Sequence, residues 1–291
     1  MISLENDIVI AKIDPHGAEL KSLFHRGTDN EYMWQGNPVH WNRSSPILFP
    51  IVGSLKEGYY TYAGQNFALP RHGFARDQRF EVLAKSSRHV EFKLGYNEET
   101  LSVFPFKFSL HVLYELDGDT VTINYRICNE NTEEAIFFSI GGHPAFNVPL
   151  TGSSGYNDYY IEFEPRSRPE RHMLTKDGLL EPSTSGVPWT GEGRLYLSND
   201  LFYKDALVFK DIKCDAVVLR SVKDNRGVKL TMKDFYHFGL WAAPDAPFVC
   251  LEPWNGISDF VDHNNAISEK LGINSLEPDK MVSYAFAIKI F

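Results

Sequence analysis

Three short segments of the chain place an ionisable side chain among glycine, proline or aromatic neighbours. They are LPRHGFARD, SIGGHPAFNVP and CLEPWNGISD, and they contribute His72, His143 and Glu252. Two imidazoles and one carboxylate on rigid backbone are the groups that proton transfer at two oxygens of one small molecule requires. We therefore take these three residues as the candidate catalytic groups.

The neighbours of each residue indicate how it is held. A glycine and a phenylalanine follow His72, so backbone can approach a ligand closely there and an aromatic ring can stack on it. The proline after His143 predicts that a strand stops pairing at this point and exposes the imidazole. An apolar run precedes Glu252 and a Pro-Trp pair follows it, so partial desolvation should raise its pKa and make it a proton acceptor near neutrality.

Each of these residues also has a purely structural interpretation. A single histidine beside glycine is more often a hydrogen-bonded turn residue, and a glutamate before proline can simply end a strand. The combination of three such segments is much harder to explain in this way, because proton-transfer chemistry needs all three groups together.

The elements that must position these groups are predicted to be strands. Apolar residues alternate with polar ones along 106–116 and again along 121–127, and the turn Asp117-Gly118-Asp119 between them predicts a hairpin. The run AIFFSIGGH, 135–143, continues the alternation and predicts the third strand of an antiparallel meander. Further hairpins are expected around residue 64, residues 86–87 and residues 225–227, and the C-terminal run 280–291 alternates once more.

Helical periodicity is scarce, and AISEKLG near residue 270 is the best candidate for one short helix. The segment from Thr151 to Leu195 is rich in Gly, Pro, Ser and charge, which predicts long loops over one face of a sandwich. The fold class expected is therefore all-β, a large antiparallel β-sandwich, with residues 1–291 forming a single domain.

Composition narrows the class of partner. The net charge of -9 and the absence of a basic tract disfavour nucleic acid and anionic membranes, which bind through clustered Lys and Arg. No run approaches the roughly 20 apolar residues of a membrane span, and the first residues, MISLENDIVIAKID, combine no cationic segment with a long apolar core, so we expect neither secretion nor membrane insertion. Three widely spaced cysteines fit a reducing cytoplasm and form no zinc or redox motif. We expect a cytoplasmic monomer or homodimer acting on a small molecule.

Five motifs in order, LFPIVG, RHGFARD, GGHPAFN, DALVF and CLEPW, extend over nearly the whole chain and resemble those of the aldose 1-epimerase (galactose mutarotase) superfamily. The branch of mutarotase-like proteins from lactose operons is the most similar. The resemblance implies a galactose mutarotase-like supersandwich and a reaction that interconverts sugar anomers without metal or cofactor. It implies that His143 is the general acid at the ring oxygen and Glu252 the general base at the C1 hydroxyl. It also implies that His72 binds the sugar near the ring oxygen and that Asp205 holds sugar hydroxyls.

The chain departs from the better-known galactose mutarotases where they carry an arginine in a glycine-arginine segment, because it has SSPILFPIVGSLKEG there. Arg43 and Arg76 are the candidates for holding the sugar instead. Trp254 and Trp241 could stack on a sugar face, although core packing is at least as good an interpretation of Trp241. The HGFAR segment also resembles hexose-6-phosphate mutarotases, so a free hexose and a 6-phosphate both stay open, and the acidic net charge favours the free sugar slightly.

Two other classes of protein fit part of the pattern. A non-catalytic carbohydrate-binding protein would use the same aromatic-rich face, but it would not need His143 and Glu252 together. A metal-dependent hydrolase could use His72, His143 and Glu252 as ligands. We disfavour the hydrolase and predict no metal site, because such sites often take two ligands from one strand, as in His-x-His, and that spacing is absent.

Overall fold

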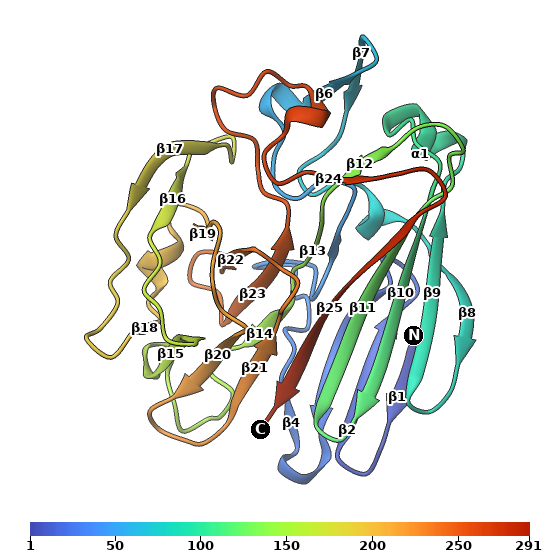
Figure 1. Ribbon diagram of the computed structural model, residues 1–291. Coiled ribbons are helices and arrows are strands. Elements are labelled where there is room, and N and C mark those ends of the chain that lie inside the picture. Colours follow the sequence, from blue (N-terminus) through green and yellow to red (C-terminus); the bar gives the residue numbers. More distant parts are fainter.

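A computed structural model describes residues 1–291 and shows a molecule built almost entirely from antiparallel strands (Figure 1). The larger sheet has nine strands in the order β18 (Arg194–Tyr196), β15 (Tyr159–Glu164), β20 (Ala216–Ser221), β21 (Gly227–Thr231), β25 (Met281–Ile290), β11 (Thr120–Asn129), β10 (Phe108–Asp117), β9 (His89–Gly95) and β8 (Glu81–Lys85). The second large sheet runs through β17 (Leu180–Ser185), β16 (Arg171–Leu174), β19 (Leu207–Phe209), β22 (His237–Trp241), β23 (Phe248–Asn255), β13 (Ile140–Gly142) and β5 (Ile47–Leu48), with β14 (Ala145–Asn147) also on β23.

Three smaller sheets and a few short helical turns complete the chain. The N-terminal sheet contains β1 (Ile2–Glu5), β2 (Val9–Asp14), β3 (Glu19–His25) and β4 (Asn30–Glu31), and the two-stranded sheets are β6 (Tyr59–Tyr62) with β7 (Gln65–Ala68) and β12 (Ile136–Phe138) with β24 (Asn274–Leu276). The only α-helix is α1 (Glu98–Val103), and the 3-10 turns are η1 (Arg26–Thr28), η2 (Lys56–Gly58), η3 (Ala75–Asp77), η4 (Tyr156–Asp158), η5 (Asn199–Phe202) and η6 (Ile267–Glu269). None of the helices has the length and apolar character needed to cross a membrane.

One cluster of 69 buried residues takes apolar side chains from both large sheets and from the N-terminal sheet, so these layers share a single core. The hairpin of β10 and β11 shows how the sequence produces this arrangement. Its register pairs Asp117 with Thr120, and buried positions alternate with more exposed ones along all of β11 and along β10 from Leu110 onward. The predicted hairpins β6–β7, β8–β9 and β20–β21 and the C-terminal strand β25 also form. The prediction of an all-β antiparallel fold is confirmed.

The predicted third strand of the meander is wrong. On the side away from β10, β11 pairs with β25. The run 136–142 leaves this sheet and divides into β12, paired with β24, and β13, paired with β23 and β5. The glycines of this run explain the tight packing, because a Cβ on Gly142 would lie 2.8 Å from the ring of Phe286 and one on Gly141 2.8 Å from the ring of Trp254.

The segment 151–195 is not a set of long loops, since it contains β15, β16, β17 and β18. Its strands lack the alternation that identifies a half-buried strand. The first five residues of β15 are all buried, and the residues of β16 are all half-buried, so neither strand shows a period of two.

The predicted helix near residue 270 is only the single 3-10 turn η6. The true helix, α1, has six residues and begins with a capping box in which the Asn97 side chain accepts from Thr100 N–H and the Thr100 hydroxyl accepts from Asn97 N–H. Asn97 and Thr100 were therefore the local signal for this helix.

Candidate active site

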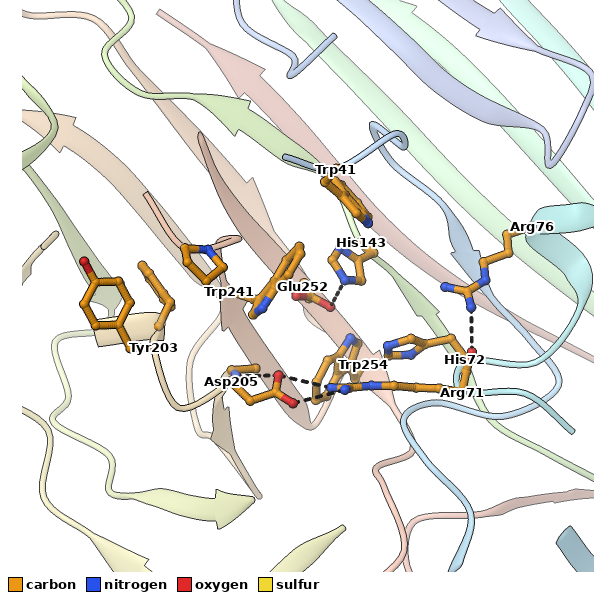
Figure 2. A pocket seen from close by; sticks show the side chains of 13 residues that line it. Trp41, Arg71, His72, Arg76, His143, Tyr203, Asp205, Trp241, Glu252 and Trp254 are labelled. Carbon is orange, nitrogen blue, oxygen red and sulfur yellow. Dashed lines mark hydrogen bonds and ion pairs between the residues drawn. The ribbon is translucent and has the colours of Figure 1, made fainter. Parts of the chain in front are cut away.

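A cavity of about 410 Å³ opens beside β22 and β23 and gathers side chains from segments far apart in the chain (Figure 2). Six of the seven predicted site residues line it, and Arg43 does not. The lining residues are Trp41, Arg71, His72, Arg76, His143, Phe202, Tyr203, Asp205, Ala206, Trp241, Pro244, Glu252 and Trp254.

His143 and Glu252 face each other across two strands. β13 and β14, which flank His143, both pair with β23 in one continuous register, so His143 lies directly opposite Glu252. Residues opposite each other on one face of an antiparallel pair have Cβ atoms about 5 Å apart. His143 Nε2 lies 3.1 Å from Glu252 Oε2 (Figure 2). The strand pairing itself thus fixes an imidazole against a carboxylate at the cavity.

Gly239 of β22 lies opposite Glu252 on the other side of β23. A Cβ at Gly239 would lie 2.4 Å from the Trp254 ring, so only glycine leaves room for this ring beside the carboxylate. The Nε1 atom of Trp254 is buried and has no hydrogen-bond partner in the protein. As a donor it opposes the rise that burial causes in the pKa of Glu252.

Burial controls the ionisation of the pair. Glu252 is 1% exposed and His143 7% exposed. Desolvation raises the pKa of Glu252 well above its usual value, and Arg71 opposes this shift. Desolvation, assisted by Arg76, Arg71 and Arg43, lowers the pKa of His143 to about 3. Burial thus favours the neutral form of each group, and the pair holds one proton over the intermediate pH range.

The imidazole of His143 is therefore buried at the cavity wall and not exposed as the sequence predicted. Pairing with β23 also continues past His143, since Leu251 N–H donates to Pro144 O at 3.0 Å, and aromatic rings cover the side chain. The ring centroid of Trp41 lies 4.9 Å from that of His143, and the centroid of Trp241 lies 5.7 Å from it. Trp241, for which stacking on a sugar and core packing were both open, contacts the cavity.

His72 sits in a tight turn between β7 and η3 and has a left-handed backbone, φ 70°. The following residue, Gly73, has φ 69°, and a Cβ there would lie 2.3 Å from Phe49 O, so this glycine serves backbone packing. Gly53 N–H donates to His72 Nδ1 at 3.1 Å. Because Nδ1 accepts, the neutral ring carries its proton on Nε2. Burial, with Arg71 next in effect, lowers the pKa of His72 well below 6.5, so the ring can offer a donor but does not carry a charge.

Arg71 and Asp205 form a two-pronged ion pair at the cavity, with Nη1–Oδ2 and Nη2–Oδ1 distances of 3.1 and 3.3 Å (Figure 2). Asp205 also accepts from Ala206 N–H and has φ 76°, a conformation that aspartate adopts more readily than most residues. The ion pair joins the turn before η3 to the turn after η5.

Arg76 reaches the same part of the cavity. Its Nη2 donates to Arg71 O at 2.7 Å, while its Nε is buried without a hydrogen-bond partner and lies 3.8 Å from Asp77. Arg43 instead pairs with Asp77 at 2.6 Å and lies outside the cavity lining. Arg43 therefore contacts Asp77 and the backbone of Arg76 and does not line the cavity.

Sequence reasoning missed Arg71, Trp41 and Tyr203, which also line the cavity. Arg71 was the easiest to find, because it directly precedes His72 in the same motif. Its importance depends on Asp205, which is 134 positions away in the chain. Nothing in the local sequence of Trp41 or Tyr203 indicates that they reach the cavity.

The ligand set considered for a metal-dependent hydrolase does not form, since His72 is not part of a metal-sized cluster with His143 and Glu252. The side chains of His143, Cys250 and Glu252 do come together, with one potential ligand atom of each lying within 4.8 Å of the others.

Comparison with known proteins agrees with the fold and with the ordered motifs. A family model described as aldose 1-epimerase matches residues 1–278. Protein LacX, chromosomal, of Lactococcus lactis subsp. lactis is 32% identical over 291 residues, which cover 95% of each chain. A solved structure of a galactose mutarotase related enzyme from Lactobacillus acidophilus is 37% identical and has a TM-score of 0.94, covering 100% of this chain and 97% of that one. A galactose mutarotase-like protein from Lactobacillus casei ATCC 334 is 31% identical, also with a TM-score of 0.94 and full coverage of both chains.

Proposed function

Because the chain belongs to the aldose 1-epimerase family, we propose that it interconverts the α and β anomers of a hexose by acid and base catalysis. The observation that carries this proposal is the buried contact of 3.1 Å between His143 Nε2 and Glu252 Oε2 at the cavity. Glu252 and His143 are the proposed catalytic residues. The acidic net charge supports a small sugar as the partner, and the cysteine pattern supports a cytoplasmic location.

The chemistry follows from the structure of a cyclic aldose, which is a hemiacetal. Ring opening needs one proton to leave O1 while another reaches O5. Glu252 takes the first proton and His143 gives the second, so neither oxygen develops a full charge. Each well-placed group typically contributes about 10²- to 10⁴-fold to such a rate. Rotation about C1–C2 and reversal of both transfers then give the other anomer.

The His143–Glu252 pair holds one proton, and the proposed catalytic cycle requires this number. Before ring opening it is on His143, and Glu252 is ionised. After ring opening it is on Glu252 and His143 is neutral, which is the distribution that burial favours in the sugar-free protein. The polar groups of the bound sugar replace water around the ionised pair, so substrate binding stabilises the first distribution.

The remaining polar groups hold the sugar. His72 offers its Nε2–H near the ring oxygen, in agreement with its tautomer. The Arg71–Asp205 pair offers both donors and acceptors to hydroxyl groups, as sugar recognition requires. Trp254 adds an indole ring and an Nε1–H donor that lowers the pKa of Glu252.

A hexose 6-phosphate is the second candidate substrate, and Arg76 is the observation in its favour. Asp205 pairs with Arg71. Asp77 lies closer to Arg43, at 2.6 Å, than to Arg76, at 3.8 Å, and the buried Nε of Arg76 has no hydrogen-bond partner. A guanidinium with unused donors binds phosphate strongly.

A panel of anomerisation rates tests both candidates. Rates for glucose, galactose and their 6-phosphates are followed by polarimetry and by NMR exchange between the anomers. Arg76→Ala should change the efficiency with free sugars by less than about tenfold and reduce any 6-phosphate activity considerably more. Arg26→Ala, which removes an arginine from an exposed ion pair with Glu5, is the control.

The outcomes separate the function classes. A wild-type preference for 6-phosphates that Arg76→Ala abolishes would establish the phosphorylated substrate. Binding of sugar without any acceleration would identify a non-catalytic carbohydrate-binding protein. Neither binding nor acceleration across the panel would refute the proposed function.

A further inference from the structure

Cys250 lies just behind the catalytic pair and has no part in the proposed reaction. It precedes Glu252 by two residues on β23, so both side chains project from the same face of the strand. Ala145 pairs with Cys250 in the register that places His143 opposite Glu252, so Cys250 is the diagonal neighbour of His143. One potential ligand atom of each of His143, Cys250 and Glu252 lies within 4.8 Å of the others.

Two polar atoms of this cluster are buried and lack hydrogen-bond partners. They are His143 Nδ1 and Glu252 Oε2. Glu252 Oε2 faces His143 Nε2 at 3.1 Å, but this contact does not have hydrogen-bond geometry. Cys250 is fully buried and forms no disulfide. Buried polar atoms are nearly always paired in folded proteins, so unpaired ones indicate that a further group can occupy the site.

The chemistry of the three atoms selects the class of ligand. A thiolate sulfur, an imidazole nitrogen and a carboxylate oxygen are the donor set that zinc and related transition-metal ions prefer. With bonds of about 2.0 to 2.3 Å, tetrahedral ligands lie roughly 3.5 Å apart, so the widest pair here must close by about 1 Å. Because His143 and Glu252 line the cavity, the fourth position of such a metal would face the solvent there.

We infer that Cys250, His143 and Glu252 form a binding site for a zinc-class divalent ion, which occupies the catalytic pair when no sugar is bound. The metal replaces the proton of the pair and the thiol proton, and both protons leave to solvent. The ion is therefore an inhibitor that competes with sugar, a consequence that rests on the proposed function. Binding of the metal itself does not depend on the proposed function.

Titration with the metal ion alone, without sugar, tests the proposed metal site. Co²⁺ added to the purified, metal-free chain should bind one ion per molecule and produce the near-ultraviolet absorption of a thiolate bound to Co²⁺. Zn²⁺ should abolish this absorption by displacing Co²⁺, since it binds more tightly to such ligands. Isothermal titration with Zn²⁺ gives the affinity and the stoichiometry.

Cys250→Ala removes the sulfur ligand from a position outside the cavity lining. It should abolish the thiolate absorption and weaken Zn²⁺ binding by at least about tenfold, which corresponds to about 1.4 kcal/mol. Cys214→Ala and Cys128→Ala are the matched controls and should leave both signals unchanged. Circular dichroism verifies that each variant is folded.

Absence of the thiolate absorption in the wild-type chain would overturn the proposed site. So would its persistence in Cys250→Ala, or its loss in Cys128→Ala. If the mutarotase function is correct, Zn²⁺ should also raise the apparent KM for sugar in the wild type and have at least about tenfold less effect on Cys250→Ala. A chain that binds the metal as expected but never accelerates anomerisation would retain the metal site and lose the proposed function.

Discussion

His143 and Glu252 illustrate why two residues distant in sequence can be recognised as partners. Each stands in a Gly- or Pro-containing segment with aromatic neighbours, and this context is visible in the sequence. Their opposition across β13, β14 and β23 and their nearly complete burial follow from strand pairing, which the sequence does not specify. The residue types were therefore predictable, whereas their contact and the position of Cys250 beside them required the structure.

The two cavity histidines are expected to differ in function. His143→Asn should lower kcat by at least about 10²-fold, because it removes the proposed acid. His72→Asn should have a smaller effect on kcat and mainly raise KM, since Gly53 N–H already occupies His72 Nδ1 and the ring serves only as a donor. Steady-state polarimetry on folded variants measures both effects, with the exposed His89→Asn as control. A larger kcat loss in His72→Asn would exchange the two assignments.

The pH dependence on the acid side provides another test of the pair. Because burial lowers the pKa of His143 to about 3, acid does not add a second proton to the pair until far below the usual imidazole range. The enzyme-catalysed kcat/KM should therefore show no fall with a midpoint near 6.5 between pH 7 and pH 5, after subtraction of the buffer-catalysed rate. An inflection near pH 6.5 would mean that His143 titrates as an ordinary solvated histidine.

At the level of elements, period-two alternation predicted the hairpins correctly because each forms within a short stretch of chain. It failed for 136–142 and for 151–195, where the partners are distant strands or where a strand has no polar face. The role of Arg71 was missed for the same reason, because its partner is distant in the sequence. Its partner Asp205 comes from the turn after η5, so the pair connects two turns that have no sequence relation.

Breaking this connection should affect sugar binding more than turnover. Arg71→Gln leaves Asp205 without its two guanidinium contacts, so the aspartate and its turn lose their fixed position. We expect KM to rise by about tenfold or more and kcat to change less. Arg26→Gln, in an exposed ion pair with Glu5, is the matched control and should be neutral. A kcat loss as large as the KM increase would instead assign Arg71 to the transition state.

Across the whole molecule, the two large sheets and the N-terminal sheet share one core, and the hydroxyl of Tyr32 donates to Phe291 O, which joins the start of the chain to its end. Inside this assembly several histidines are buried and uncharged. Burial lowers the pKa of His72 well below 6.5 and that of His237 to about 4. Global stability should therefore respond to pH.

The sign of this response follows from proton binding. Between pH 6.5 and about 4, the unfolded chain protonates His237 whereas the folded chain does not, so stability falls as pH falls. His72 acts in the same direction, because its pKa is also lowered in the folded chain. The His143–Glu252 pair binds about one proton in both states near pH 5.5 and contributes little there. His237 can remove up to about 2 kcal/mol between pH 7 and pH 5, and His72 adds to this loss. Urea midpoints should be lower at pH 5, and His237→Gln should reduce the difference. An equal difference in this variant would contradict the assignment.

Glu252 is the proposed base that opens the sugar ring, and the substitution Glu252→Gln tests this role. This substitution preserves the shape of the side chain and removes its basicity, so the fold and weak sugar binding should remain. The anomerisation rate of the best hexose substrate should fall by at least about 10²-fold when measured by polarimetry, with sugar binding checked by NMR. Retention of more than about a tenth of the wild-type rate in the folded variant would show that Glu252 is not the general base.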